Sequence, residues 1–399
     1  MYSFANRSLL PILLIISLIL NSCQENESFR AKFLISADPF LVRDADEIRA
    51  FILASGLDLP LDAIEHNVQL YKVNYRTTFK GEEITASGLV ILPVTNGQVA
   101  MISFQHGTIT AHSQAPTKLP LNSGELIYYA SLSTIGLITV VPDYIGFGAS
   151  EEIFHPYYIE EYTASAVIDL LQAAKELAQL EQVSFNKKLF LAGYSQGGYA
   201  TMATHKAIEQ NGLPSFNLIA SFPAAGGYDV KGVQEYFFDQ VTYDDPYYLA
   251  YVSMAYKTTY EWAEPLATYF KEPYASSIPS LFDGSKTGSQ INSELTTTVA
   301  ELIAPDLLAN ISTNPAYNHL NEAFQVNSLL NWVPATTMIM YHGDSDITVP
   351  YENSVTTYNH FITNGASGTV QFIPLAGATH GTGVVPYIED FVAKLIDLM

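Results

Sequence analysis

The feature that most restricts the fold is a five-residue stretch, Gly-Tyr-Ser-Gln-Gly, at residues 193–197. A strand-like apolar run precedes it, and a helix-like segment follows it. A serine at such a strand-to-helix turn is held in a strained conformation with its Oγ exposed above the sheet, and small residues two positions before and after it let strand and helix pack closely. Gly193 and Gly197 supply these small residues. The stretch therefore predicts a nucleophilic serine, Ser195, at the end of a strand.

Strand-like and helix-like segments alternate along most of the chain. The segments 68–75 and 84–93 predict an antiparallel pair of strands, and residues 40–66 before them predict a helical lead-in. Continuous apolar runs, typical of strands buried on both faces, follow at residues 99–104, 137–142, 188–192, 218–223, 336–341 and 369–374. This order predicts an α/β fold with a mostly parallel, doubly wound sheet that carries its functional residues at the carboxyl ends of the strands.

One gap between strands is too long for a single crossover. It covers residues 227–332, contains proline and glycine breaks, and holds a large share of the 26 tyrosines. These features predict several short helices, which we interpret as a cap inserted over the catalytic face. The predicted domains are therefore a tether and lead-in at 23–66, a core at 67–226 and 333–399, and the cap insertion.

A serine nucleophile needs a histidine to take its proton and an acid to orient that histidine. Of the nine histidines, His360 and His380 lie well beyond the strand that ends near residue 341. His360 falls in a helix-like segment, whereas His380 lies in a loop just after the last strand, which favours His380 as the base. For the acid, Asp344 and Asp346 both follow the preceding strand.

The tetrahedral intermediate of acyl transfer needs backbone N–H donors for its oxyanion. One donor is expected from Gln196, the residue after the serine. The second is expected from the loop after residue 104, where His106, Gly107 and Thr108 are the alternatives. Residues 143–148 predict a tight structural turn, in which Tyr144 is a candidate for facing the pocket.

Several of these segments together resemble the α/β-hydrolase superfamily, and within it the secretory lipases of the yeast lipase A type. They are residues 105–108, 141–148, 193–198 and the Gly-x-x-Asp-x-x-Val-Pro segment at 343–350. The resemblance implies that Asp346 is the triad acid, that Asp344 structures its loop, and that the Thr108 N–H is the second oxyanion donor. The chain order Ser195, Asp346, His380 is the order of that superfamily.

The resemblance also implies an α/β-hydrolase fold and hydrolysis of carboxylic esters, including acylglycerols, without a metal or organic cofactor. The expected partner is a small-molecule or lipid ester. The chain departs from the family in lacking a cysteine pair and in its lipoprotein-like start, so the family's acyl-chain preference is not carried over.

Two other functions compete with ester hydrolysis. Capped hydrolases of this fold include aminopeptidases, which need acidic side chains in the cap to hold a free amine. The candidate acids here are Asp239, Asp244, Asp245 and Glu261. The other alternative is a catalytically silent surface-binding protein on a hydrolase scaffold.

The N-terminus carries a targeting signal. Residues 1–22 contain one arginine, Arg7, and then an apolar stretch too short to span a bilayer comfortably. Residues 20–23 resemble the lipobox of bacterial lipoproteins, which ends in the cysteine that carries lipid. Cys23 is the chain's only cysteine, and we expect it to anchor the protein outside the cytoplasm, at the outer membrane or cell surface. An ordinary cleaved signal peptide is the alternative.

The charge of the chain limits its partners. Forty acidic residues against 18 basic ones give a net charge of −22, which argues against binding nucleic acid or anionic lipid headgroups. The histidines are scattered, so no metal site is expected, and no phosphate-binding glycine loop is present.

Overall fold

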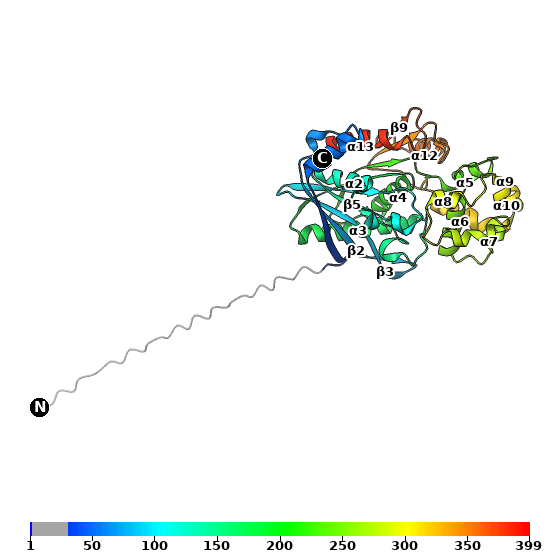
Figure 1. Cartoon of the computed structure of the whole chain (residues 1–399), viewed down its shortest axis with the longest axis horizontal. Coiled ribbons are helices and arrows are strands. Elements are labelled where there is room, and N and C mark those ends of the chain that lie inside the picture. Colours follow the sequence, from blue (N-terminus) through cyan, green and yellow to red (C-terminus); the bar gives the residue numbers. More distant parts are fainter. Residues whose placement is uncertain (2–30) are drawn as a thin grey trace. The chain divides into compact units, whose positions relative to one another are not determined.

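A sheet of nine strands forms the centre of the computed structural model, which describes Met1 and residues 31–399 (Figure 1). The strand order across the sheet is β1-β2-β3-β5-β4-β6-β7-β8-β9. The strands are β1 (Leu34–Arg43), β2 (Val68–Phe79), β3 (Glu82–Pro93), β4 (Gln98–Gln105), β5 (Leu137–Pro142), β6 (Ser184–Tyr194), β7 (Asn217–Ala224), β8 (Thr337–Gly343) and β9 (Val370–Leu375).

The sheet is antiparallel at one edge and parallel elsewhere. β1, β2, β3 and β5 pair antiparallel to one another in that order. All pairs from β5 to β9 are parallel. The register places Gln105 beside Gly193 and Tyr194 beside Ala224, so the carboxyl ends of β4, β6 and β7 meet at one edge. The predicted α/β fold with a mostly parallel sheet is confirmed.

Helices cover both faces of this sheet. Alternate residues of β3 point into different apolar clusters. Leu89 and Ile91 pack with the helices at residues 45–55, 124–134 and 384–398, whereas Val90 packs with those at 160–180 and 196–211. Burial on both faces explains why the parallel strands read as continuous apolar runs. The helices are α1 (Ala45–Ser55), α2 (Gly124–Thr134), α3 (Glu160–Leu180), α4 (Gln196–Asn211), α12 (Tyr351–Thr363) and α13 (Val384–Leu398).

The predicted helical lead-in at residues 40–66 is wrong at its start. Phe40 to Arg43 belong to β1, which pairs with β2 and places Leu41 opposite Leu70. Within residues 40–66, only residues 45–55 form a helix of more than one turn, α1. The helical prediction failed for residues 40–43 because pairing with the edge of β2 decides the conformation of this segment. The sheet therefore begins well before residue 67.

The residues between β7 and β8 form seven short helices, gathered on one side of the sheet (Figure 1). They are α5 (Val230–Phe238), α6 (Tyr247–Thr259), α7 (Tyr274–Leu281), α8 (Gly288–Asn292), α9 (Val299–Leu302), α10 (Pro305–Asn310) and α11 (Asn318–Asn327). We call residues 225–336 the β7–β8 insertion. Its buried tyrosines and aliphatic side chains form one cluster with α12 and part of β8.

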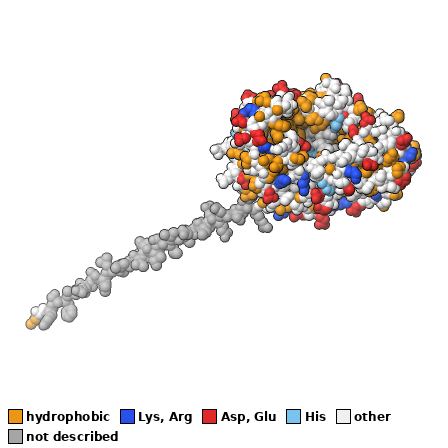
Figure 2. Space-filling view, viewed as in Figure 1, with side chains coloured by type: hydrophobic (Ala, Val, Ile, Leu, Met, Phe, Trp, Pro, Cys, Tyr) orange, Lys and Arg blue, Asp and Glu red, His pale blue; other side chains and the backbone are white. Residues whose placement is uncertain are grey.

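The predicted targeting segment and Cys23 lie outside the described residues. Among the helices that the structure describes, none is both long enough and apolar enough to cross a membrane. Figure 2 shows Asp and Glu side chains around the visible face of the folded part and hydrophobic side chains around a hollow between them.

Candidate active site

Ser195 lies on the turn between β6, which ends at Tyr194, and α4, which begins at Gln196. Its φ of 61° and ψ of −123° are strained for a residue with a side chain. The flanking glycines are required by contact. A Cβ on Gly193 would lie 2.4 Å from the Gly197 carbonyl oxygen, and a Cβ on Gly197 would lie 1.9 Å from the carbonyl oxygen of Gln105. The strand and the helix thus approach too closely for any larger residue.

His380 reaches Ser195 from the loop after β9. Its Nε2 lies 2.9 Å from Ser195 Oγ, and its Nδ1 lies 2.6 Å from Asp346 Oδ2. Because a carboxylate only accepts, Nδ1 carries the proton and Nε2 is left to accept the serine proton. The Tyr194 hydroxyl donates to the His380 carbonyl oxygen at 2.8 Å, which holds this loop against the end of β6.

Asp346 is buried at the end of β8, and every oxygen of its carboxylate has hydrogen-bond partners. Oδ1 accepts the backbone N–H groups of Thr348 and Val349 at 2.9 and 3.0 Å. Oδ2 faces His380 and also His342, whose Nε2 lies 3.1 Å away. Burial alone would raise the pKa of Asp346, but hydrogen bonds from His342 and His380 and the charges of both rings lower it to about 2. The carboxylate therefore stays ionised.

The sequence did not single out His342. It is fully buried, and its Nδ1 lies 2.6 Å from the Ser354 hydroxyl of α12. Its Nε2 also lies 3.0 Å from the carbonyl oxygen of Val349. His342 thus links Asp346 to α12. The only signal in the sequence was its place four residues before Asp346, at the end of a strand.

The two alternative residues, Asp344 and His360, lie elsewhere. Asp344 Oδ1 accepts the backbone N–H of Gly377 at 2.7 Å, so this side chain ties the loop after β8 to the loop after β9. His360 is on α12, where its carbonyl oxygen accepts from Asn364. Neither side chain hydrogen-bonds to Ser195.

The two predicted oxyanion donors belong to the residue after Ser195 and to a loop near it. Gln196 is the first residue of α4, so its N–H is at a helix N-terminus, where developing negative charge is favoured. The loop of Thr108 is also close: a Cβ on Gly107 would lie 3.7 Å from Ser195 Cβ. Within residues 31–399, neither the Gln196 nor the Thr108 N–H donates to a protein acceptor. Neither N–H is therefore held by another group of the described residues.

His106 stays apart from the proton-transfer chain. Its Nδ1 lies 2.7 Å from the Gly107 carbonyl oxygen, and burial lowers its pKa. The hydroxyl of Tyr144, a buried residue with φ of 66°, donates to the His106 carbonyl oxygen at 3.2 Å. The two side chains pack together with ring centroids 4.4 Å apart. Tyr144 thus supports the loop of Thr108.

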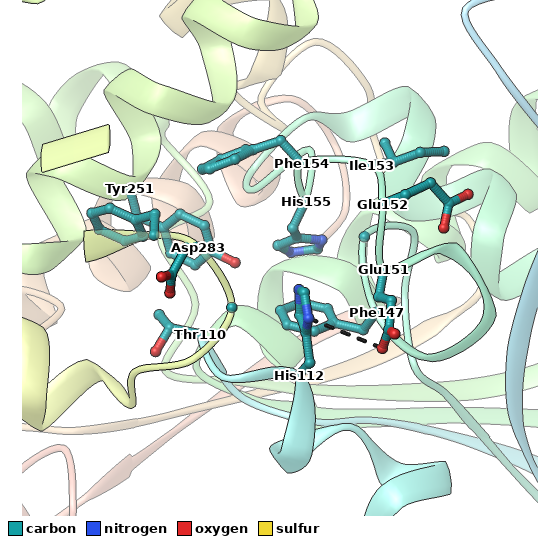
Figure 3. Close-up of a pocket in the computed structure, with 13 residues that line it drawn as sticks. Thr110, His112, Phe147, Glu151, Glu152, Ile153, Phe154, His155, Tyr251 and Asp283 are labelled. Atoms are coloured by element: carbon teal, nitrogen blue, oxygen red, sulfur yellow. Dashed lines mark ion pairs between the residues drawn. The ribbon is translucent and has the colours of Figure 1, made fainter. Parts of the chain in front are cut away.

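A second histidine that the sequence did not reveal, His155, holds the Gln196 side chain. Its Nδ1 lies 2.6 Å from the Ile145 carbonyl oxygen and must donate to it. Its Nε2 is then an acceptor for the Gln196 amide, 2.7 Å away. Burial lowers the pKa of His155 to about 3, so the ring is neutral. The ring also forms a wall of a cavity of 230 Å³ between Phe154 and His112 (Figure 3).

Two of the four acidic side chains considered for amine recognition, Asp245 and Glu261, are tied to different parts of the molecule. Asp245 accepts from the Thr348 hydroxyl at 3.1 Å and from Asn292 at 3.0 Å. Glu261 forms a surface ion pair with Lys80, on the turn between β2 and β3, at 2.8 Å. Across residues 31–399, no group of three His, Asp or Glu side chains is arranged to hold a metal ion.

Known proteins share this architecture. Residues 116–235, which include Ser195 but neither Asp346 nor His380, match the family model of the secretory lipases. A Legionella pneumophila protein described as a hydrolase superposes with a TM-score of 0.83 at 27% identity, covering 92% of this chain and 98% of that chain. The rice cell wall degrading esterase LipA from Xanthomonas oryzae gives a TM-score of 0.79 at 25% identity, covering 92% and 98%.

Candida antarctica lipase A in its closed state has the same fold, with a TM-score of 0.67 at 16% identity, covering 92% of this chain and 83% of that chain. No curated protein matches the chain in sequence. The chain therefore has the α/β-hydrolase fold and resembles the secretory lipases, as its motifs indicate.

Proposed function

Because the chain has the α/β-hydrolase fold and resembles secretory lipases and esterases, we propose that it is a serine carboxylic-ester hydrolase that works through an acyl-serine intermediate. The observation that carries this proposal is the line of hydrogen bonds from Ser195 Oγ through His380 to Asp346, at 2.9 and 2.6 Å. The three residues take the roles of nucleophile, general base and orienting acid.

In the first half of the proposed reaction, the Ser195 proton moves to His380 Nε2 as Oγ bonds to the ester carbonyl carbon. The carbonyl oxygen takes the negative charge and accepts hydrogen bonds from the Gln196 and Thr108 N–H groups. Asp346 stabilises the imidazolium. When the intermediate collapses, the bond to the alcohol oxygen breaks, and His380 gives its proton to the departing alcohol.

In the second half, water replaces the alcohol. His380 takes a proton from water as the hydroxide bonds to the acyl carbon. The second tetrahedral intermediate collapses by breaking the bond to Ser195 Oγ, which regains its proton from His380. The acid is then released, and the serine is ready for another ester.

Hydrolysis of nitrophenyl butyrate by the purified protein tests the proposal. We expect Ser195→Ala and His380→Ala each to lower kcat by about 10⁴-fold or more, because the members of such a triad act as a unit. Asp344→Asn is the matched control for the acid, and Asp346→Asn should lose far more activity than it does. Full turnover by either the Ser195 or the His380 variant would refute the roles given to them.

We propose further that residues 227–332, within the β7–β8 insertion, act as a cap over the site, and that the protein is a lipoprotein held outside the cytoplasm by Cys23. Resemblance to secretory lipases supports export, and the lipobox-like residues 20–23 support the anchor. Cys23→Ser should move the protein from the membrane fraction to the soluble fraction. Full-length wild type released without detergent, with no mass added at Cys23, would contradict the anchor.

A further inference from the structure

A small apolar cavity lies where α5 and α6 of the β7–β8 insertion meet the loop before α3. Its volume is 40 Å³, and it is lined by Tyr157, Tyr158, Val230, Val233, Phe237 and Val252 among others. No Asp, Glu, Lys, Arg or His is among the described residues that line it. An occupant must therefore be uncharged and largely apolar.

Tyr157, Tyr158, Tyr243 and Tyr248 line this cavity, and the protein engages the hydroxyls of the first three. Tyr157 OH lies 2.8 Å from the Thr108 hydroxyl, and the Tyr243 hydroxyl donates to the Thr348 carbonyl oxygen at 3.0 Å. Tyr158 OH accepts from the Gly227 N–H at 3.3 Å. Since these three hydroxyls are satisfied, their rings offer the cavity their apolar faces.

Three links connect the cavity to the reacting serine. Tyr157 contacts Thr108, a proposed oxyanion donor. Thr348, also in the lining, donates its N–H to Asp346. Gly227 lies three residues after Ala224, whose carbonyl oxygen accepts the Ser195 N–H at 2.9 Å. The cavity thus borders the oxyanion side, the acid side and the backbone that supports Ser195.

We propose that this cavity is the acyl-binding subsite and that it selects short, straight acyl chains. This inference rests on the proposed ester hydrolysis and names its substrate class. A water-sized group needs about 10–15 Å³ of cavity volume, so the cavity admits about three or four such groups. Beyond the carbonyl carbon, that corresponds to a butyryl or pentanoyl chain.

A series of nitrophenyl esters from acetate to octanoate tests the size of the subsite. Each methylene that enters the cavity should raise kcat/KM by about fourfold, so butyrate should exceed acetate by more than tenfold. Octanoate should fall at least tenfold below butyrate, because its last carbons have no room in a 40 Å³ cavity.

Two variants of the lining alter the cavity in opposite directions. Val233→Phe, on α5, should lower the butyrate-to-acetate ratio of kcat/KM by at least tenfold. Val252→Ala, on α6, should move the optimum to a longer chain. Ile153→Phe is the matched control, because it adds similar bulk to the separate cavity beside His155 and should leave the chain-length profile unchanged.

The outcomes separate the two claims. If the wild type hydrolyses no ester in a Ser195-dependent manner, the proposed function fails, and the subsite fails with it. If turnover depends on Ser195 but the folded Val233→Phe and Val252→Ala proteins keep the wild-type profile, the subsite is wrong and the proposed function stands. A wild-type optimum at octanoate would also overturn the subsite. Circular dichroism of each variant identifies any that fail to fold. One folded variant is enough to test the subsite.

Discussion

At the scale of single residues, the side chain after the nucleophile is fixed by an unexpected partner. Gln196 contributes its backbone N–H to the proposed oxyanion site, while its side-chain amide is bound by His155 at 2.7 Å. The Ile145 carbonyl oxygen sets the tautomer of that ring. His155 thus acts as a positioning residue, since it reaches the reacting atoms only through Gln196.

Loss of this contact should affect kcat rather than KM. We expect His155→Phe to lower kcat by about tenfold to a hundredfold, somewhat less than the removal of an oxyanion donor, with KM within about twofold of the wild-type value. His155→Gln should recover part of the loss, because its amide can both donate to Ile145 and accept from Gln196. Steady-state ester kinetics measures both effects. His360→Phe, on α12, is the control and should behave as wild type.

If His155→Phe raised KM and left kcat unchanged, or if His155→Gln were as impaired as His155→Phe, the positioning role would be wrong. A purely structural role would instead lower the thermal stability and the activity of both variants together.

Asp346 should couple stability to acid pH. Its pKa is about 2 in the folded protein against an ordinary value of 3.8. A carboxyl with a lowered pKa stabilises the folded state above its unfolded pKa, and this contribution is lost as pH falls through the folded pKa. We therefore expect about 2 kcal/mol of the unfolding free energy to disappear between roughly pH 5 and pH 2.

Urea unfolding at several pH values, for the wild type and for Asp346→Asn, measures this contribution. The unfolding free energy of the variant should change less with pH than that of the wild type, by about the 2 kcal/mol that Asp346 contributes, because the amide does not titrate. Parallel pH profiles for the two proteins would contradict the assignment. The groups facing Asp346 are His342 on β8 and His380 in the loop after β9.

At the scale of elements, the turn that holds Ser195 depends on the close approach of β6, α4 and β4. A methyl group on Gly197 would meet the Gln105 carbonyl oxygen, which is backbone and cannot move alone. Gly197→Ala should therefore cost about 3 kcal/mol of stability, the upper range for overpacking. Gly368→Ala is the control, since a Cβ at that position would have no atom within 4 Å. Thermal unfolding compares the stabilities of the two variants. Equal unfolding temperatures would contradict the prediction and show that the turn can accommodate a methyl group.

The elements most open to prediction were those with a single strong pattern. The parallel strands read as continuous apolar runs because helices cover both faces. β1 was missed because its pairing with β2 is a long-range contact that local spacing does not encode. His155 and His342 were missed for the same reason: each acts through a side chain brought near by the fold.

At the scale of the whole molecule, three loops at the carboxyl edge of one sheet bring Ser195, Asp346 and His380 together although the chain separates them widely. Strand order explains this meeting, because β6, β7, β8 and β9 are consecutive neighbours. The β7–β8 insertion adds an aromatic layer next to this edge, with its own buried cluster. The motifs predict that the site lies at the carboxyl edge of the sheet. They do not predict the cavity between α5 and α6, because that cavity depends on how the insertion packs.

Covalent labelling with a fluorophosphonate tests whether Ser195 is an activated nucleophile, because such a reagent reacts fastest with a serine whose proton is taken by a neighbouring base. Intact-mass and peptide analysis of the labelled wild type should find one adduct, on Ser195, formed much more slowly in His380→Ala and absent from Ser195→Ala. An unlabelled wild type, or an adduct on another residue that forms equally fast in the His380 variant, would contradict the account.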